Sequence, residues 1–160
     1  DSGKVFAIEP VPINFEILTK NIKLNNLSNI IEPHNLAISS RTGVRKLNIA
    51  RKSNLHSLTK TKNTFDTIEV QTTTVDHFFE HRPFVNFIKM DIEGAEYEVI
   101  EALPKNRVAI NQILIEFHHM YKGIPISKTV DAISTLSNLG FELFNISPRT
   151  YEFSFRKKGM

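Results

Sequence analysis

The sequence contains no cysteine. This absence excludes disulfide bonds and thiolate metal sites, and it agrees with a cytoplasmic location, where disulfides are rare. No apolar run approaches the roughly 20 residues that a membrane-spanning helix needs, and no signal peptide is visible. We therefore expect a cytoplasmic protein without a membrane span.

An initiating methionine is also missing. The chain begins with Asp-Ser-Gly-Lys and almost at once enters an apolar stretch, residues 5–8, that predicts a strand. Its 160 residues and 18.3 kDa suit one domain with a buried core, and no linker or internal repeat divides it. We expect residues 1–160 to form a single domain that is a segment of a longer chain.

Acidic residues are absent between Glu32 and Asp66, whereas basic residues are frequent there. The basic side chains of this segment are Arg41, Arg45, Lys46, Arg51, Lys52, Lys60 and Lys62. Clustered cations attract phosphate groups, including those of RNA. The segment has no aromatic side chains between the basic ones, however, and the net charge of the chain is only +3. We therefore favour a solvated flap over a nucleic-acid surface.

Alternating strand and helix patterns predict an α/β fold. A strand at 5–8, a helix from Pro12 to about Asn25 and a strand that begins at Ile30 form a unit of the size expected for parallel pairing. The other expected elements are a hairpin turning at Gly43, a strand at 67–75, a short helix capped by Asp76, a buried strand at 85–90, a helix at 94–103, a buried strand at 113–117, a helix capped by Ser127, and an antiparallel hairpin formed by 141–146 and 151–155.

The stretch from Phe84 to Glu101 is the most informative part of the sequence. An apolar run, residues 85–90, leads into three carboxylates, Asp91, Glu93 and Glu96, and then into a helical pattern. Open α/β sheets keep their sites at such strand ends. The helix dipole alone accounts for acidic residues near a helix N-terminus, so Glu93 and Glu96 are interpreted as residues that shape the turn. Asp91 is the candidate site residue.

The buried strand at 113–117 also ends in polar side chains, Glu116, His118 and His119. Alternation along a strand places Glu116 and His118 on the same side. Together with Asp91 they form either a general-base site or a hard-metal site, and Mg²⁺ is a possible cofactor. The sequence leaves both alternatives open and assigns no metal ligand.

Polar residues follow the first two strands as well. Glu9 stands at the end of the first strand, where a carboxylate can accept two hydrogen bonds from a ribose diol. Asn35 follows the second strand, with Leu36 and Ala37 beside it, so this loop can offer an amide and apolar contacts to an adenine ring. The alternative for both positions is an ordinary solvated loop.

With these residues in place, the sequence resembles the FkbM family of S-adenosylmethionine-dependent methyltransferases. The resemblance is carried by Val-Phe-Ala-Ile-Glu-Pro at 5–10, Asn-Leu-Ala-Ile-Ser at 35–39, Thr-Thr-Val-Asp at 73–76, Phe-Ile-Lys-Met-Asp-Ile-Glu-Gly-Ala-Glu at 87–96 and Ile-Leu-Ile-Glu-Phe-His at 113–118. It extends to about residue 155.

The resemblance implies a Rossmann-like class I methyltransferase sheet, mostly parallel, with a C-terminal antiparallel hairpin. It also implies O-methylation of a hydroxyl on a sugar, glycolipid or other small molecule, with S-adenosylmethionine as the cofactor. Glu9, Asn35, Leu36, Ala37 and Asp91 would then bind the cofactor. The catalytic candidates are Asp91, Glu116 and His118, one of which would take the proton of the acceptor hydroxyl.

One departure from the family pattern concerns the N-terminal side. The family's first strand and glycine-rich loop, which should precede Val5, are absent from the sequence. In this fold that strand lies between the strand at 5–8 and the strand at 85–90, so we expect an N-terminally incomplete sheet. A catalytically silent methyltransferase-like module, which binds or regulates another protein, is therefore the alternative function.

Overall fold

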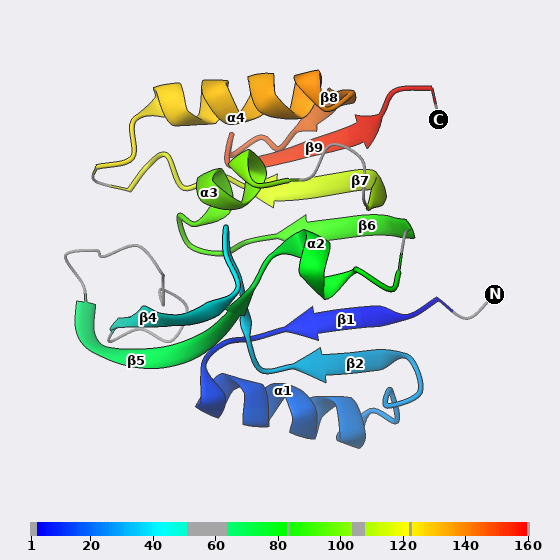
Figure 1. Cartoon of the computed structure of the whole chain (residues 1–160), viewed down its shortest axis with the longest axis vertical. Helices are drawn as coiled ribbons and strands as arrows, with labels where there is room; N and C mark the ends of the chain where they lie inside the picture. The colour runs from blue at the N-terminus through cyan, green and yellow to red at the C-terminus, as the bar shows by residue number, and fades with distance from the viewer. Residues whose placement is uncertain (1–2, 51–63, 83, 104–107, 122, 160) are drawn as a thin grey trace.

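The structure is a computed structural model that describes residues 3–50, 64–82, 84–103, 108–121 and 123–159. In chain order its elements are β1 (Val5–Ile8), α1 (Pro12–Leu24), β2 (Ile31–His34), β3 (Ala37–Ile38), β4 (Gly43–Ala50), β5 (Thr64–Thr73), α2 (Val75–Phe78), β6 (Phe84–Met90), α3 (Glu96–Glu101), β7 (Ala109–Glu116), α4 (Ile126–Asn138), β8 (Phe141–Ile146) and β9 (Glu152–Lys157). The strands form three sheets, ordered β1-β2, β3-β5-β4 and β6-β7-β9-β8 (Figure 1). The prediction of an α/β fold is confirmed.

The first strand, helix and strand form the predicted parallel unit. β1 pairs in parallel with β2, from Val5 opposite Ile31 to Ile8 opposite His34. Pro12 lies in the first turn of α1, where a backbone N–H would have no acceptor within the helix, so the lack of an N–H in proline costs no hydrogen bond. The helix ends at Leu24, and Asn26 takes a left-handed φ of 56° that reverses the chain toward β2.

The predicted hairpin at Gly43 is wrong. Gly43 is the first residue of β4, whose antiparallel partner is β5, while β3 pairs with β5 in parallel. A glycine after polar residues is found both in hairpin turns and at the start of strands, so the local sequence does not separate the two. Here Gly43 begins a strand because β4 pairs with β5, which comes much later in the chain. Residues 51–63, which connect β4 to β5, lie outside the described residues.

Two predicted helix caps are also wrong. Thr74, not Asp76, caps α2, because its hydroxyl accepts a hydrogen bond of 3.1 Å from the amide of His77. The helix α4 begins at Ile126 after Pro125 and has no side-chain cap, so Ser127 is already its second residue. Pro125 has the extended backbone, φ −72° and ψ 150°, that precedes a helix.

The four-stranded sheet contains the strands that carry the central carboxylates. β6 pairs with β7 in parallel, and β9 pairs antiparallel with both β7 and β8, as the predicted C-terminal hairpin requires. Gly140, with a φ of 85°, supplies the left-handed residue after α4 that lets the chain return as β8.

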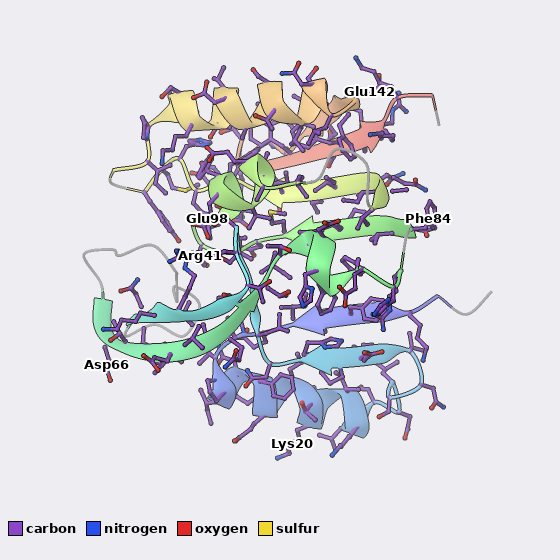
Figure 2. The ribbon with its side chains drawn as sticks, in the orientation of Figure 1. Lys20, Arg41, Asp66, Phe84, Glu98 and Glu142 are labelled. Carbon is purple, nitrogen blue, oxygen red and sulfur yellow. The ribbon has the colours of Figure 1, made fainter. Side chains whose placement is uncertain are left out.

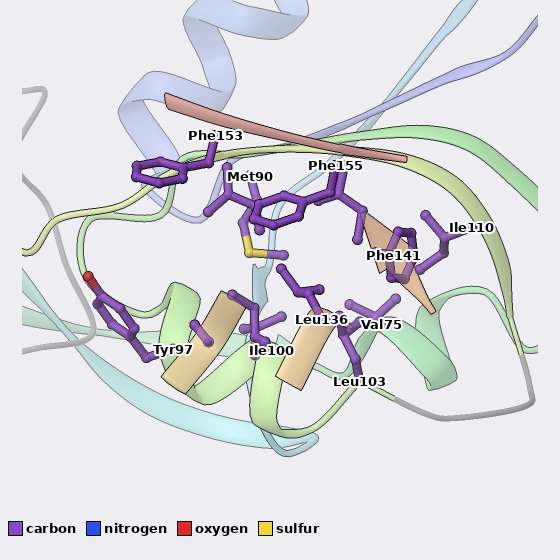
Figure 3. Packing of buried hydrophobic residues seen from close by; sticks show 14 of the residues in the cluster. Val75, Met90, Tyr97, Ile100, Leu103, Ile110, Leu136, Phe141, Phe153 and Phe155 are labelled. Carbon is purple, nitrogen blue, oxygen red and sulfur yellow. The ribbon is translucent and has the colours of Figure 1, made fainter. Parts of the chain in front are cut away.

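The main hydrophobic core lies between this sheet and the helices α3 and α4. Figure 3 shows Tyr97 and Ile100 of α3, Leu136 of α4, and Phe155 of β9 converging on one cluster. Burial of aliphatic and aromatic side chains of this size stabilises a domain by about 1.5–3 kcal/mol each. The core therefore anchors the turn between β6 and α3, on which Asp91, Glu93 and Glu96 lie.

A single, mostly parallel sheet is not confirmed. Among the described strands, the parallel pairs are β1-β2, β3-β5 and β6-β7, and the antiparallel pairs are β4-β5, β7-β9 and β8-β9. The sheets are therefore mixed. In the described part of the chain β1 pairs only with β2 and β6 only with β7, so the ladder is interrupted between β1 and β6. That a further strand belongs between them stays a prediction.

No helix within the described residues is long and apolar enough to cross a membrane. The longest, α1 and α4, have 13 residues each, which corresponds to roughly 20 Å, whereas the hydrocarbon core of a bilayer is about 30 Å thick.

Candidate functional site

The carboxyl ends of four strands lie at the same side of the molecule. Figure 1 shows β1, β2, β6 and β7 pointing in the same direction, and the predicted site residues follow these strands. Glu9 comes after β1, Asn35 after β2, Asp91 after β6 and His118 after β7. The parallel arrangement therefore gathers polar side chains from distant parts of the sequence at one edge, where α/β proteins bind ligands.

The turn between β6 and α3 is built around Glu96. Glu93 and Gly94 both have left-handed backbones, with φ values of 56° and 97°. Their conformation directs the amides of Ile92 and Gly94 toward the same carboxylate oxygen, Oε1 of Glu96, at 3.1 Å each. The Glu96 side chain is fully buried. A buried carboxylate is stable only when donors surround it, and the turn supplies two of them.

The third donor to Glu96 is His118. Nδ1 of the imidazole lies 2.8 Å from Oε1 of Glu96, and only 4% of the His118 side chain is exposed. Because the carboxylate is an acceptor, Nδ1 carries the proton of this hydrogen bond. The other ring nitrogen, Nε2, faces two more carboxylates, at 3.5 Å from Oε2 of Glu93 and 3.8 Å from Oδ1 of Asp91.

Two further side chains complete the cluster formed by Asp91, Glu93, Glu96, His118 and Tyr121, which we call the strand-end cluster. The Tyr121 hydroxyl donates a hydrogen bond to Oε2 of Glu93, and its ring lies 4.8 Å from the His118 ring. At the solvent side of the cluster, Nζ of Lys89 lies 3.4 Å from Oδ2 of Asp91. The cluster thus has a buried floor and an open rim.

The environment shifts the pKa values of three of these groups. Burial raises the pKa of Glu93, although the Tyr121 hydrogen bond and the His118 charge oppose the shift. Burial also lowers the pKa of His118, but its hydrogen bond to Glu96 and the nearby carboxylate charges outweigh this and raise it overall. The pKa of Tyr121 is raised by burial and by its hydrogen bond to Glu93. Such perturbed groups are typical of functional sites.

Glu116 is not brought into the strand-end cluster. It is the last residue of β7, opposite Glu152 of β9, and within the described residues it makes no hydrogen bond or ion pair with the cluster. The predicted alternation that joined it to His118 does not apply, because β7 ends at Glu116 and the chain leaves the strand before His118. A catalytic role for Glu116 stays a prediction.

Glu9 and Asn35 are brought together, in a different way from the predicted one. The Asn35 amide donates to the backbone oxygens of Glu9 and Pro10, at 2.8 and 3.1 Å, and Oε1 of Glu9 accepts from the amide of Val11 at 2.7 Å. Asn35 therefore positions the loop that carries Glu9. Ala37 is buried in a second hydrophobic cluster, and Leu36 is half-buried.

Sequence reasoning missed the importance of Glu96 and Tyr121. Glu96 was assigned to the helix dipole, yet it lies in a six-residue helix and holds both the turn and His118. Its apolar neighbours Ala95 and Tyr97, both buried, were the available signal that this acid faces the interior. Tyr121 follows His118 by three residues, a spacing that places two side chains together when the chain turns.

The basic segment is only partly described. Arg45 is half-buried, and its guanidinium donates to both Glu98 of α3 and Ser39. Figure 2 shows Glu98 on α3 near the three-stranded sheet, so this ion pair joins the sheet to the helix that carries Glu96. Arg41 and Lys46 of the predicted flap are exposed, and Arg51, Lys52, Lys60 and Lys62 lie outside the described residues.

The sequence matches a known protein family over most of its length. The methyltransferase FkbM domain matches residues 1–143. A curated relative, the hexuronic acid methyltransferase AglP of Haloferax volcanii, is 27% identical over 118 residues, which cover 72% of this chain and 48% of AglP. The chain thus spans about half the length of this relative.

A solved structure has a similar fold. The crystal structure of a methyltransferase FkbM from Methylobacillus flagellatus KT superposes with a TM-score of 0.55 at 19% sequence identity. The similarity covers 96% of this chain and 36% of that one. At this level of identity the likeness concerns the fold.

Proposed function

The chain belongs to the FkbM methyltransferase family, and from this premise we propose that the full-length protein transfers the methyl group of S-adenosylmethionine to a hydroxyl of a sugar or another small molecule. The oxygen of the acceptor attacks the methyl carbon, the carbon–sulfur bond breaks, and S-adenosylhomocysteine leaves. The proton of the hydroxyl passes to a base of the protein. Such a displacement depends mainly on alignment of donor and acceptor, which an ordered strand-end site supplies.

The observation that carries this proposal is the strand-end cluster. It combines a half-exposed carboxylate, Asp91, with a buried imidazole, His118, whose Nε2 lies 3.8 Å from Oδ1 of Asp91. Asp91 is the best placed to receive the proton, because 35% of its side chain is exposed. Titratable groups within reach of a hydroxyl are the first requirement of general-base catalysis.

The donor is expected to bind at the neighbouring strand ends. The amide of Val11 holds Oε1 of Glu9, and Asn35 fixes the backbone of that loop. We expect the carboxylate held in this way to accept hydrogen bonds from the ribose diol. Leu36 remains the candidate for apolar contact with adenine, whereas the burial of Ala37 limits it to shaping the loop. The structure therefore supports Glu9 as the principal cofactor residue.

The acceptor is proposed by likeness to the curated relative. Because AglP is described as a hexuronic acid methyltransferase, hexuronic acids and their glycosides are the first acceptors to try. We propose S-adenosylmethionine as the cofactor. We expect the reaction to take place in the cytoplasm, on the ground of the missing cysteines alone.

The test is calorimetry with the full-length protein and S-adenosylmethionine, followed by transfer of a labelled methyl group to a panel of uronic acids. Glu9→Gln removes the ribose acceptor charge and should weaken donor binding by about tenfold, the effect of one charge-assisted hydrogen bond. Asp91→Asn should bind the donor but lose turnover. Donor binding with no transfer to any acceptor would instead support the silent-module alternative, and no donor binding would refute the proposal.

A further inference from the structure

We propose that the strand-end cluster binds a divalent transition-metal ion, Mn²⁺ or Zn²⁺ rather than Mg²⁺, through Asp91, Glu93 and His118. These three side chains each offer one ligand atom, and the three atoms lie within 4.8 Å of one another. The ligands come from the turn after β6 and from the segment that follows β7, and both strands are anchored on the main core. Any role of the ion in methyl transfer rests on the proposed function, whereas its binding does not.

The orientation of His118 is the observation that points to a cation. Its Nδ1–H is held by Glu96, so the other ring nitrogen, Nε2, is the atom that faces the Asp91 and Glu93 carboxylates. Two carboxylates around one ring nitrogen favour a cation at this point, either a proton on Nε2 or a metal ion that takes its place. Metal-binding histidines show this arrangement, with the other ring nitrogen donating to a carboxylate.

The separations within the cluster also suit an ion better than direct contact. Nε2 lies 3.5 Å from Glu93 and 3.8 Å from Asp91, longer than a charge-assisted hydrogen bond of about 2.8 Å. An ion with bonds of about 2.1 Å holds its ligand atoms about 3.0 Å apart in octahedral geometry and about 3.4 Å apart in tetrahedral geometry. Small side-chain rotations of the two carboxylates would therefore complete the site.

The contacts around the two carboxylates orient them while each keeps an oxygen directed at His118. Lys89 contacts Oδ2 of Asp91, whereas Oδ1 is the oxygen that faces His118. The Tyr121 hydroxyl donates to Oε2 of Glu93, which orients that carboxylate as a second layer of hydrogen bonds does around metal sites. Asp91 is 35% exposed and Glu93 20%, so an ion can enter from solvent while His118 forms the floor.

The donor set decides which ion fits. Two carboxylates and an imidazole suit Mn²⁺ and Zn²⁺, because Mg²⁺ prefers oxygen ligands and keeps most of its water. This distinguishes the site from the Asp91–Glu116–His118 set that alternation along the strand predicts, since Glu93 replaces Glu116. It also assigns Glu96 as a positioning residue, which holds the imidazole without touching the ion.

The experiment uses the full-length protein, freed of metal with a chelator, with no methyl donor or acceptor present. Electron paramagnetic resonance of added Mn²⁺ measures the bound fraction, and spin-echo spectra show whether an imidazole nitrogen couples to the bound ion. We expect about one Mn²⁺ per chain with nitrogen coupling. Mg²⁺ should displace it only at about tenfold or greater excess.

Matched variants test the ligand set. His118→Gln should abolish the nitrogen coupling, whereas His119→Gln, at the neighbouring residue, should leave it unchanged. Asp91→Asn, at a position whose side chain is 35% exposed, should weaken Mn²⁺ binding by at least about tenfold, and Glu152→Gln should not. Glu96→Gln should weaken binding by about 10–100-fold, and long-range proton–nitrogen NMR spectra should show the His118 proton moving from Nδ1 to Nε2.

Three results would overturn the inference. They are no binding of Mn²⁺ or Zn²⁺ at millimolar concentrations, nitrogen coupling that survives in His118→Gln, and a loss of Mn²⁺ affinity in the control variants as large as the loss in the ligand variants. Methyl transfer that proceeds in the presence of chelator, together with no Mn²⁺ binding, would reject the metal site and leave the proposed function intact. Mn²⁺ binding without methyl transfer to any acceptor would leave the metal site intact and count against the proposed function.

Discussion

Replacement of Glu96 tests whether a buried carboxylate organises the turn after β6. Three donors converge on its Oε1: the amides of Ile92 and Gly94, at 3.1 Å each, and Nδ1 of His118, at 2.8 Å. Glu96→Ala removes the acceptor of all three and leaves a space too enclosed for free hydration, since the residue is fully buried. Glu96→Gln keeps the shape and one acceptor oxygen but removes the charge.

The magnitude follows from the number of bonds that are lost. A buried donor without an acceptor costs about 1–3 kcal/mol, so three donors that partly relax should reduce the free energy of unfolding by about 3–4 kcal/mol in Glu96→Ala. Glu96→Gln should cost about 1–2 kcal/mol, because neutral hydrogen bonds are weaker than charge-assisted ones by about that amount. Oε2 of Glu96 has no hydrogen-bond partner among the described residues, so the replacement leaves the bonds at that atom unchanged in number.

The measurement is urea denaturation followed by circular dichroism, with Glu101→Ala as the control. Glu101 lies in the same helix but is exposed, and its replacement should change stability by less than about 0.5 kcal/mol. With a denaturant slope of about 2 kcal/mol/M, Glu96→Ala should lower the urea midpoint by about 1.5–2 M. Equal losses in the Ala and Gln variants, or a loss below about 1 kcal/mol in Ala, would refute the three-donor interpretation.

Two further predictions concern the frame of the site. Gly94→Ala should lower the free energy of unfolding by about 1–2 kcal/mol, because φ at Gly94 is 97°, where a side chain is strained; Gly3→Ala, at an open position, should have no measurable effect in the same urea titration. Leu136→Ala should cost about 3–4 kcal/mol because the side chain is fully buried in the main core, whereas Leu24→Ala, at a 68% exposed position, should cost less than 1 kcal/mol. Similar losses at the two leucines in thermal melts would contradict the assigned core.

The sequence identified the strand ends that matter, because apolar runs and the residues that interrupt them are local signals. The run before Asp91 and the run before Glu116 both proved to be strands of one sheet, paired in parallel. The types of residue in the site, carboxylates and histidine, were also visible. Asp91 and His118 do meet, with Nε2 and Oδ1 3.8 Å apart.

Local sequence patterns could not show which other polar residues lie beside Asp91 and His118. Alternation predicted that Glu116 accompanies His118, but alternation holds only while the strand continues, and β7 ends at Glu116. The helix dipole explained Glu96 as a surface acid, but a dipole argument carries no information about burial. Strand ends and burial depend on what packs against the segment, and that is decided by residues far away in the sequence.

The strand-end cluster separates most clearly what the sequence determines from what the tertiary structure determines. By itself the sequence determined that acids follow β6, that histidine follows β7, and that a glycine in the turn permits an unusual backbone. Only the tertiary structure decided that Glu93 and Gly94 adopt left-handed backbones, and that Glu96 turns inward to hold one nitrogen of His118. The physical reason is that a buried carboxylate and a buried imidazole are stable only as partners, and β6–β7 pairing brings them together across 22 residues of chain.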